Sequence, residues 1–90
     1  MEVFFKTSFI KDFEDLPAST KTSVRLICIE IFPRLKRLDR PSEYPLQKLR
    51  GFKDYYRIRV GDYRSGLKQE EDKIIFMRVL NRKDIYKYFP

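Results

Sequence analysis

Histidine is absent from this chain of 90 residues, and cysteine and glycine are scarce. Without histidine, the chain has no Ser-His-Asp or Cys-His catalytic arrangement and no histidine-ligated zinc site. The three glycines, Gly51, Gly61 and Gly66, are too widely spaced to form a phosphate-binding loop. Any catalysis must therefore use Lys, Arg, Tyr, Asp or Glu. No carboxylate cluster predicts a metal site, and we expect no cofactor.

The single cysteine, Cys28, cannot form a disulfide within the chain. It falls in an apolar helical run, so we expect a buried, reduced core residue and a reducing, cytoplasmic setting. No apolar run approaches the roughly 20 residues that a membrane span needs, and the N-terminus has no secretory signal pattern. We therefore expect no membrane-embedded segment and no membrane partner.

Charge of one sign dominates the composition. The chain has 20 Lys and Arg against 13 Asp and Glu, which gives a net charge of +7. Such a balance favours polyanionic partners such as nucleic acid, a ribosome or an acidic protein, although excess lysine can also serve solubility alone. Hydrophobic residues make up 42% of the chain and aromatic residues 16%, which is enough for a core. We expect one folded domain over residues 1–90.

The first half of the sequence predicts one strand and two helices. Residues 2–7 are typical of a strand, Ser8 can cap a short helix, and Ser19 or Thr20 can cap a second one. Apolar residues recur every three or four positions along the second helix, and further ones indicate burial on more than one side. Pro33 should end or kink this helix. The recurring residues are Val24, Ile27, Cys28, Ile31 and Leu35, broadened by Leu26, Ile29 and Phe32.

The second half predicts three strands. After a polar loop over residues 37–45, two strands flank a turn at Gly61-Asp62, and a last strand covers residues 73–80 beyond an acidic turn at 70–72. The last strand is apolar on both faces, so it should lie inside the sheet. The expected fold is α+β, a two-layer βααβββ arrangement with two N-terminal helices packed on a mostly antiparallel four-stranded sheet and a short C-terminal element.

The hairpin around Gly61-Asp62 places three arginines side by side. The dipeptide suits a type II′ turn, in which glycine supplies the positive φ. Counting outward from the turn pairs Arg59 with Arg64 and puts Arg57 on the same face. The opposite face carries Tyr56, Ile58, Val60, Tyr63 and Leu67. Because like charges opposed on a sheet cost stability, we expect an anion, most readily a phosphate backbone, to neutralise them.

Other basic and aromatic residues extend this candidate surface. Arg78 is the only charge within residues 74–80 of the last strand, with Phe76 and Leu80 expected on its face, and it needs either an ion-pair partner such as Glu30 or a solvent-lined cleft. Basic residues and tyrosines are interleaved beyond that strand. This pattern suits the binding of single-stranded RNA, although Tyr86 can equally be a packing residue. The candidate RNA-binding residues are Lys48, Arg50, Lys53, Arg78, Lys83, Lys87 and Tyr88.

Four segments together resemble the RelE/ParE superfamily of toxins from type II toxin–antitoxin systems: residues 48–51, 56–60, 61–64 and 79–86. The predicted element order matches as well, so the resemblance covers nearly the whole chain. In the RelE branch the toxin enters the ribosomal A site and cuts messenger RNA. The resemblance implies a small acidic antitoxin, the ribosome and mRNA as partners, and a toxin–antitoxin hetero-oligomer. It also implies that the catalytic positions are Arg57, Arg59, Arg64, Arg82 and Tyr86, with Arg64 as the transition-state arginine.

The resemblance implies RNA cleavage without a metal. RNA carries its own nucleophile, the 2′-hydroxyl, so an enzyme can act by in-line orientation and by stabilising the phosphorane charge. Two features depart from the family pattern: the best-known ribosome-dependent member has lysines where this chain has Arg57 and Arg59, and many relatives have His at the position of Asn81. Two alternatives remain, a ParE-like inhibitor of DNA gyrase and a non-catalytic basic module that binds RNA or an antitoxin.

Overall fold

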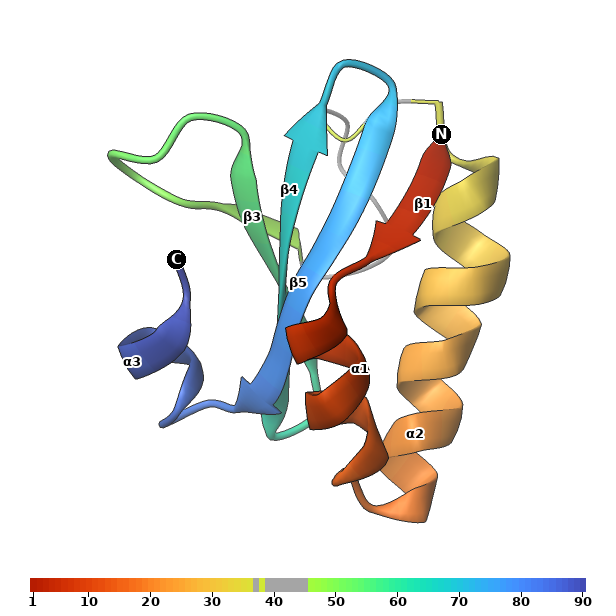
Figure 1. The fold of residues 1–90 in the computed structure, drawn as a ribbon, viewed down its shortest axis with the longest axis vertical. Coiled ribbons are helices and arrows are strands. Elements are labelled where there is room, and N and C mark those ends of the chain that lie inside the picture. Colours follow the sequence, from red (N-terminus) through yellow and green to blue (C-terminus); the bar gives the residue numbers. More distant parts are fainter. Residues whose placement is uncertain (37, 39–45) are drawn as a thin grey trace.

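Two helices cover one face of a twisted sheet, and a short third helix lies against the other face (Figure 1). The computed structural model describes residues 1–36, 38 and 46–90. No helix among them is long and apolar enough to cross a bilayer. The elements are β1 (Glu2–Phe5), α1 (Thr7–Glu14), α2 (Ala18–Arg25), β2 (Leu46–Lys48), β3 (Tyr55–Val60), β4 (Tyr63–Glu70), β5 (Lys73–Asn81) and α3 (Ile85–Tyr88).

The sheet of the described residues has five strands in the order β1-β5-β4-β3-β2. β1 runs parallel to β5, and every other neighbouring pair is antiparallel. The predicted α+β architecture and the interior position of β5 are confirmed. The predicted count of four strands is wrong, because β2 pairs with β3 at the edge. The predicted loop over residues 37–45 lies, apart from Leu38, outside the described residues.

The helices follow the predicted order but differ at their ends. Neither Ser8 nor Ser19 caps a helix: Lys6 precedes α1 and Pro17 precedes α2, and neither helix has a side-chain cap. The Oγ of Ser8 instead donates to the carbonyl of Met77. α2 continues through a π-helical turn at Leu26–Ile31 and ends in a 3-10 turn at Phe32–Arg34, so Pro33 ends it as predicted.

Only one side of the second helix is buried. Leu26 is 48% exposed and Ile29 is 56% exposed, so the prediction of burial on several sides is wrong. Cys28 lies on the buried side and is a free thiol, as predicted, and burial raises the pKa of this thiol. The core between helices and sheet is built from large side chains, including Val24, Phe32, Ile58, Leu67, Ile74 and Phe76.

A smaller core on the opposite face holds α3 in place. Ile85 and Phe89 are buried there with Leu49, and Met77 and Leu80 pack around them. The sheet accommodates the ring of Phe89 because position 66 is glycine: a Cβ there would come within 2.5 Å of the ring carbons. This close approach fixes the C-terminal segment on the same face as Arg57, which pairs with Gly66 across the strands.

The hairpin between β3 and β4 has the predicted register. Val60 pairs with Tyr63 and Arg59 with Arg64, and Gly61 has the positive φ of +61° that the turn requires. A β-bulge in the β4–β5 pairing leaves Met77 between two paired residues. One extra residue reverses the alternation of faces. The prediction that Phe76 and Leu80 share a face is therefore wrong, since they pack in the two different cores.

Candidate nucleic-acid interface

A cleft of about 310 Å³ opens over the arginine-bearing face of the hairpin. Strands β2, β3 and β4 form its floor, and α3 contributes Tyr86 at its rim. Among the residues that the structure describes, none that lines it has an acidic side chain. We call it the arginine cleft, and its lining residues are Leu46, Gln47, Arg57, Arg59, Arg64 and Tyr86.

Two of the arginines in the cleft are held by specific contacts. Nη1 of Arg64 donates to the carbonyls of Gly61 and Tyr63, both at 2.9 Å, which fixes the side chain against the turn. Both bonds use the same nitrogen, so the remaining N–H groups of the guanidinium can reach a phosphate. The Cζ of Arg57 lies 4.5 Å from the ring centroid of Tyr86, a cation–π distance that orients this exposed tyrosine.

A second cleft of about 390 Å³ adjoins the first and shares Gln47 and Arg57 with it. Lys48, Arg50 and Phe52 also line it, together with the C-terminal residues Phe89 and Pro90. We call it the loop cleft, because the loop between β2 and β3 forms one wall. The predicted RNA-binding residues Lys48 and Arg50 are thus placed beside the arginine cleft.

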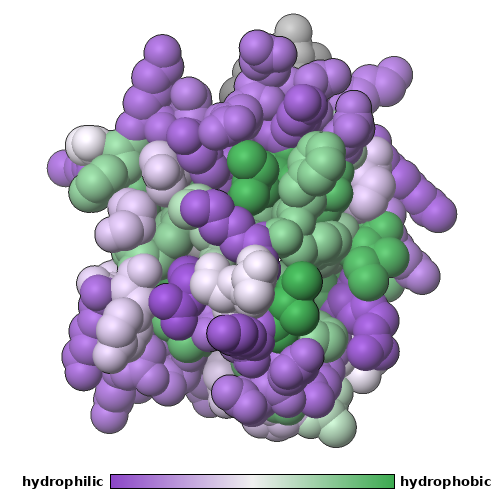
Figure 2. Space-filling view, viewed as in Figure 1, coloured by the Kyte–Doolittle hydropathy of each residue, from purple (hydrophilic) through white to green (hydrophobic). Residues whose placement is uncertain are grey.

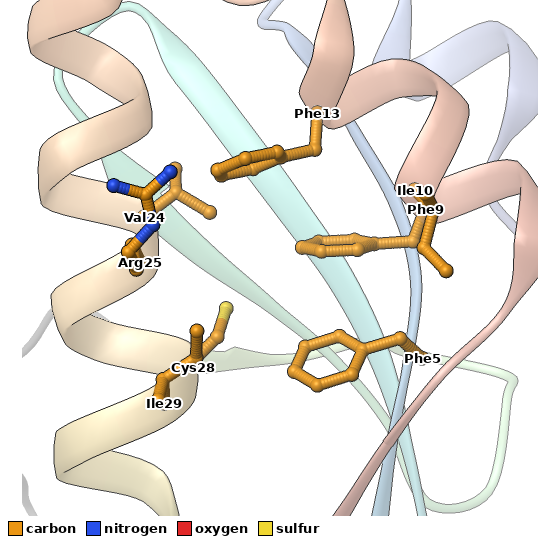
Figure 3. A pocket seen from close by; sticks show the side chains of 8 residues that line it. All are labelled: Phe5, Phe9, Ile10, Phe13, Val24, Arg25, Cys28 and Ile29. Carbon is orange, nitrogen blue, oxygen red and sulfur yellow. The ribbon is translucent and has the colours of Figure 1, made fainter.

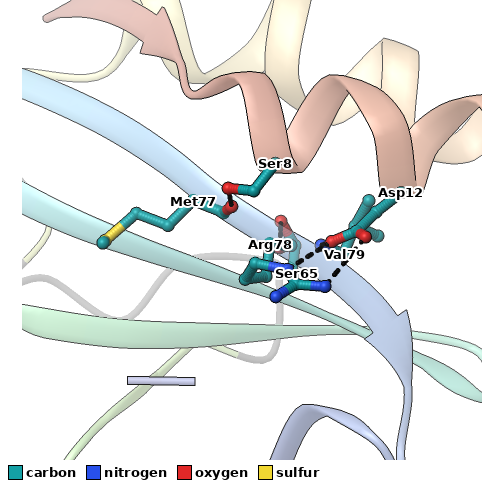
Figure 4. Close-up of polar contacts among 6 residues, drawn as sticks. All are labelled: Ser8, Asp12, Ser65, Met77, Arg78 and Val79. Atoms are coloured by element: carbon teal, nitrogen blue, oxygen red, sulfur yellow. Dashed lines mark hydrogen bonds and ion pairs between the residues drawn. The ribbon is translucent and has the colours of Figure 1, made fainter. Parts of the chain in front are cut away.

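Arg78 occupies a different environment from the other predicted site residues. Its Nε donates to Oδ2 of Asp12 at 2.7 Å and its Nη2 to Oδ1 at 3.0 Å (Figure 4). The predicted ion pair is therefore real, but the partner is Asp12 on α1 and not Glu30. Hydrogen bonding to this carboxylate raises the pKa of Arg78. The guanidinium also lies 5.5 Å from the ring of Tyr88, so Arg78 connects α1 with α3.

The same contacts show why α1 lies where it does. β1 pairs with β5 only as far as Phe76, so none of the described strands lies beside that edge of β5 beyond this point. α1 supplies the missing partners: Ser8 donates to the carbonyl of Met77, and Asp12 accepts the backbone N–H of Val79 at 3.1 Å (Figure 4). Covering a strand edge with a helix satisfies its backbone groups.

The remaining predicted residues surround the clefts without lining them. Arg82 is exposed just after β5, and its backbone N–H donates to the carbonyl of Asp62 in the hairpin turn, so it lies near the turn that holds Arg64. Lys53, Lys83, Lys87 and Tyr88 are exposed and belong to neither cleft.

Asn81 has a structural role at the start of the C-terminal segment. Its Oδ1 accepts the backbone N–H groups of Lys83 and Asp84, both at 2.9 Å. Its Nδ2 also donates to the carboxylate of Asp84. This side-chain turn sets the direction in which the chain leaves β5 and therefore where Tyr86 begins its approach to Arg57.

Sequence reasoning did not identify Leu46, Gln47 and Phe52 as parts of this surface. Leu46 and Gln47 lie on β2, a strand of three residues, which is too short to give an alternating pattern. Phe52 lies in a loop that mixes basic and apolar residues, and a single aromatic residue in such a loop does not by itself predict a binding role. An exposed aromatic flanked by Arg50 and Lys53 was the only available indication.

An apolar groove lies between α1 and α2, away from the arginine cleft. The rings of Phe5, Phe9 and Phe13 form one wall, Cys28 faces them from the π-helical turn that continues α2, and Arg25 stands at the rim over Phe13 (Figure 3). Hydrophobic side chains also gather on the surface over β1, α1 and α2, within a hydrophilic margin (Figure 2). Exposed apolar residues of β1, α1 and the π-helical turn that continues α2 are Phe5, Ile10, Leu26 and Ile29.

Comparison with known proteins identifies relatives of the whole chain. Residues 3–86 match the model of a family described as the ParE toxin of the type II toxin–antitoxin system parDE. Toxin RelE3 of Methanocaldococcus jannaschii is 42% identical over 90 residues, which is 100% of both chains.

Solved structures agree with this assignment. A RelB-RelE antitoxin–toxin complex from Methanococcus jannaschii matches with a TM-score of 0.82 and 40% identity, covering 97% of this chain and 99% of that chain. The intact E. coli RelBE complex shares the fold, with a TM-score of 0.67 and 19% identity over 89% of this chain and 94% of that one. The chain therefore belongs to the RelE/ParE superfamily of toxins from type II toxin–antitoxin systems.

Proposed function

We propose that this toxin is an endoribonuclease that cuts messenger RNA in the ribosomal A site, in the cytoplasm. One observation carries the proposal. Three arginines and a tyrosine converge on one cleft, and none of the described residues that line it is acidic. Such a cleft suits a phosphodiester, because guanidinium groups bind phosphate oxygens through paired hydrogen bonds and an aromatic ring can stack a base.

Cleavage would use the 2′-hydroxyl of the substrate. Its oxygen attacks the adjacent phosphorus while the bond to the 5′-oxygen breaks, giving a 2′,3′-cyclic phosphate and a 5′-hydroxyl. Arg64, fixed against the hairpin turn, would stabilise the negative charge of the phosphorane, and Arg57 or Arg59 would hold the second phosphate oxygen. Arginine is too basic to accept the hydroxyl proton, so solvent takes it, with the hydroxyl of Tyr86 able to relay it, and solvent protonates the leaving oxygen.

The ribosome would supply what the cleft lacks. The chain contains no histidine, and its arginines clamp a phosphate without aligning the 2′-hydroxyl. Alignment of reacting groups lowers a barrier by several kcal/mol, and an A site that holds the messenger in one geometry provides it. Naked RNA should therefore be cut slowly or not at all, and translated messages should be cut within codons.

A small acidic antitoxin is the partner that we propose for the free toxin. The net charge of +7 favours an acidic chain over the arginine cleft. The exposed apolar residues over β1, α1 and α2 provide a second surface that such a chain would cover. The two RelBE structures, which are toxin–antitoxin complexes, support the same proposal.

Inhibition of DNA gyrase is the second candidate, since the matching family model describes the ParE toxin. Expression in cells separates the two activities when mRNA 5′ ends, plasmid supercoiling and growth are followed together. The ribonuclease gives new 5′ ends within codons and unchanged supercoiling. A gyrase inhibitor gives the reverse, and growth arrest with neither change, or no arrest, indicates a non-catalytic binding module.

A further inference from the structure

Phe52 in the loop cleft is placed as a stacking surface. Its side chain is 49% exposed, although it lines a cleft. The ring meets Tyr55 edge-on, with the centroids 6.2 Å apart, and Tyr55 in turn lies 5.8 Å from the buried Phe89. Phe52 is therefore supported from one side by packed aromatic rings, while about half of its own surface stays in water.

Three cations line the same cleft as this ring. Lys48, Arg50 and Arg57 line the loop cleft, and within the described part of the chain no acidic side chain lines it. Lys48 and Arg50 are exposed and can move to meet a ligand. A flat apolar ring beside several cations is the combination that binds a nucleotide of single-stranded RNA, with the base on the ring and the phosphate on the cations.

The loop cleft adjoins the arginine cleft. Gln47 and Arg57 line both of them. An RNA strand with one phosphate on Arg57 would therefore have neighbouring nucleotides in each cleft. Tyr86 stands over Arg57 in the first cleft, and Phe52 stands in the second, so each cleft has its own aromatic ring.

We propose that the loop cleft binds the RNA nucleotide next to the scissile phosphate, with its base stacked on Phe52 and its phosphate held by Lys48 and Arg50. This inference rests on the proposed function, because it takes RNA as the ligand of the arginine cleft. It adds a specificity-determining residue, Phe52, that neither the sequence pattern nor the family resemblance indicated.

A fluorescent RNA tests the inference directly. The probe is a short single-stranded RNA with 2-aminopurine at one position and 2′-O-methyl groups throughout, which prevents cleavage; stacking on an aromatic ring quenches its fluorescence. The purified full-length toxin and four variants are titrated at low salt: Phe52→Ala, Phe52→Leu, Phe52→Tyr and Phe4→Ala. Phe4 is a matched control, because it is 44% exposed and lies on β1 with Lys73 near its ring.

Binding and quenching by the wild type are expected to persist in Phe52→Tyr and Phe4→Ala. They should weaken about fivefold or more in Phe52→Ala and Phe52→Leu, as loss of one base-stacking ring predicts. Leucine keeps the bulk and the contact with Tyr55 but has no flat face, so an equal loss in both variants at unchanged melting temperature separates stacking from folding. Undiminished quenching in Phe52→Ala and Phe52→Leu, or no binding by the wild type, would overturn the inference.

Mapping the mRNA ends in cells that express the toxin distinguishes failure of the Phe52 stacking site from failure of the proposed ribonuclease function. If wild type and Phe52→Ala give the same message ends at the same rate, the stacking site is refuted while the ribonuclease stands. If wild type cuts no message but Phe52-dependent quenching is seen, the ribonuclease is refuted and the nucleotide site stands as a binding site for RNA.

Discussion

At the scale of single residues, the arginine cleft contains like charges that repel each other, an arrangement that a sheet with a purely structural role would avoid. Arg59 and Arg64 are direct cross-strand partners, and like charges in that position cost up to about 1 kcal/mol. Arg64 reduces this cost by donating to two turn carbonyls, and Arg57 by lying over the ring of Tyr86. The arrangement therefore keeps positive charge concentrated at one point of the surface, ready for a phosphate.

The tyrosines of α3 give a prediction at this scale. Tyr86 and Tyr88 are similarly exposed, at 64% and 59%, but only Tyr86 lines the arginine cleft. Tyr86→Ala should lower message cleavage about tenfold or more, a loss typical of removing one base-stacking contact. Tyr88→Ala should change it much less. Primer extension on message from expressing cells compares the two, and equal losses would remove Tyr86 from the site.

At the scale of secondary-structure elements, α1 acts as the cover of an open strand edge. Asp12 is the central contact: its carboxylate accepts two bonds from Arg78 and one from the backbone of Val79, and its side chain is only 11% exposed. The contact holds α1, β5 and, through the ring of Tyr88, the C-terminal segment together.

Asp12→Asn should destabilise the fold by about 1–3 kcal/mol, because the half-buried guanidinium of Arg78 and the backbone N–H of Val79 then lose their charged acceptor. Glu14→Gln is the matched control, since Glu14 ends the same helix and is exposed. Urea unfolding measures both variants, and the control should stay within about 0.5 kcal/mol of the wild type. If the two variants are equally stable, the ion pair does not anchor α1.

Docking of α3 depends on Gly66, which leaves room for the ring of Phe89. Gly66→Ala should displace the C-terminal segment and lower message cleavage, while the core between helices and sheet stays formed. Hydrogen exchange should show faster exchange confined to residues 82–90.

A double-mutant cycle with Phe89→Ala checks the cause of that displacement. Once the ring is removed, adding Gly66→Ala should cost little more, since the clash no longer exists. Fully additive effects of the two substitutions would mean that Gly66 acts through something other than Phe89.

Local patterns allowed much of this fold to be predicted, and contacts between distant segments limited the rest. The hairpin register followed from a two-residue turn and strict alternation, both of which lie within twelve residues of sequence, 53–64. By contrast, Asp12 and Arg78 are 66 positions apart, and nothing local distinguishes Asp12 from Glu30 as the partner. The bulge at Met77 and the short strand β2 likewise depend on pairing with neighbours.

On the scale of the whole molecule, the main hydrophobic core and the proposed catalytic cleft lie on opposite faces of one sheet. The large core and the apolar groove lie on the side of α1 and α2, whereas the arginine cleft lies on the side of α3. Substitutions in the cleft should therefore change activity with little effect on the core.

Mapping message ends in cells that express Arg64→Ala tests the central claim most directly. The comparison includes the wild type and Arg34→Ala, which removes an exposed arginine from the 3-10 turn after α2, outside the arginine cleft. We predict cuts within codons for the wild type and Arg34→Ala, a loss of about a hundredfold or more for Arg64→Ala as expected for removal of a transition-state donor, and little cutting of the same RNA without ribosomes. Undiminished cutting by Arg64→Ala would contradict the account, as would equal cutting of naked and translated RNA.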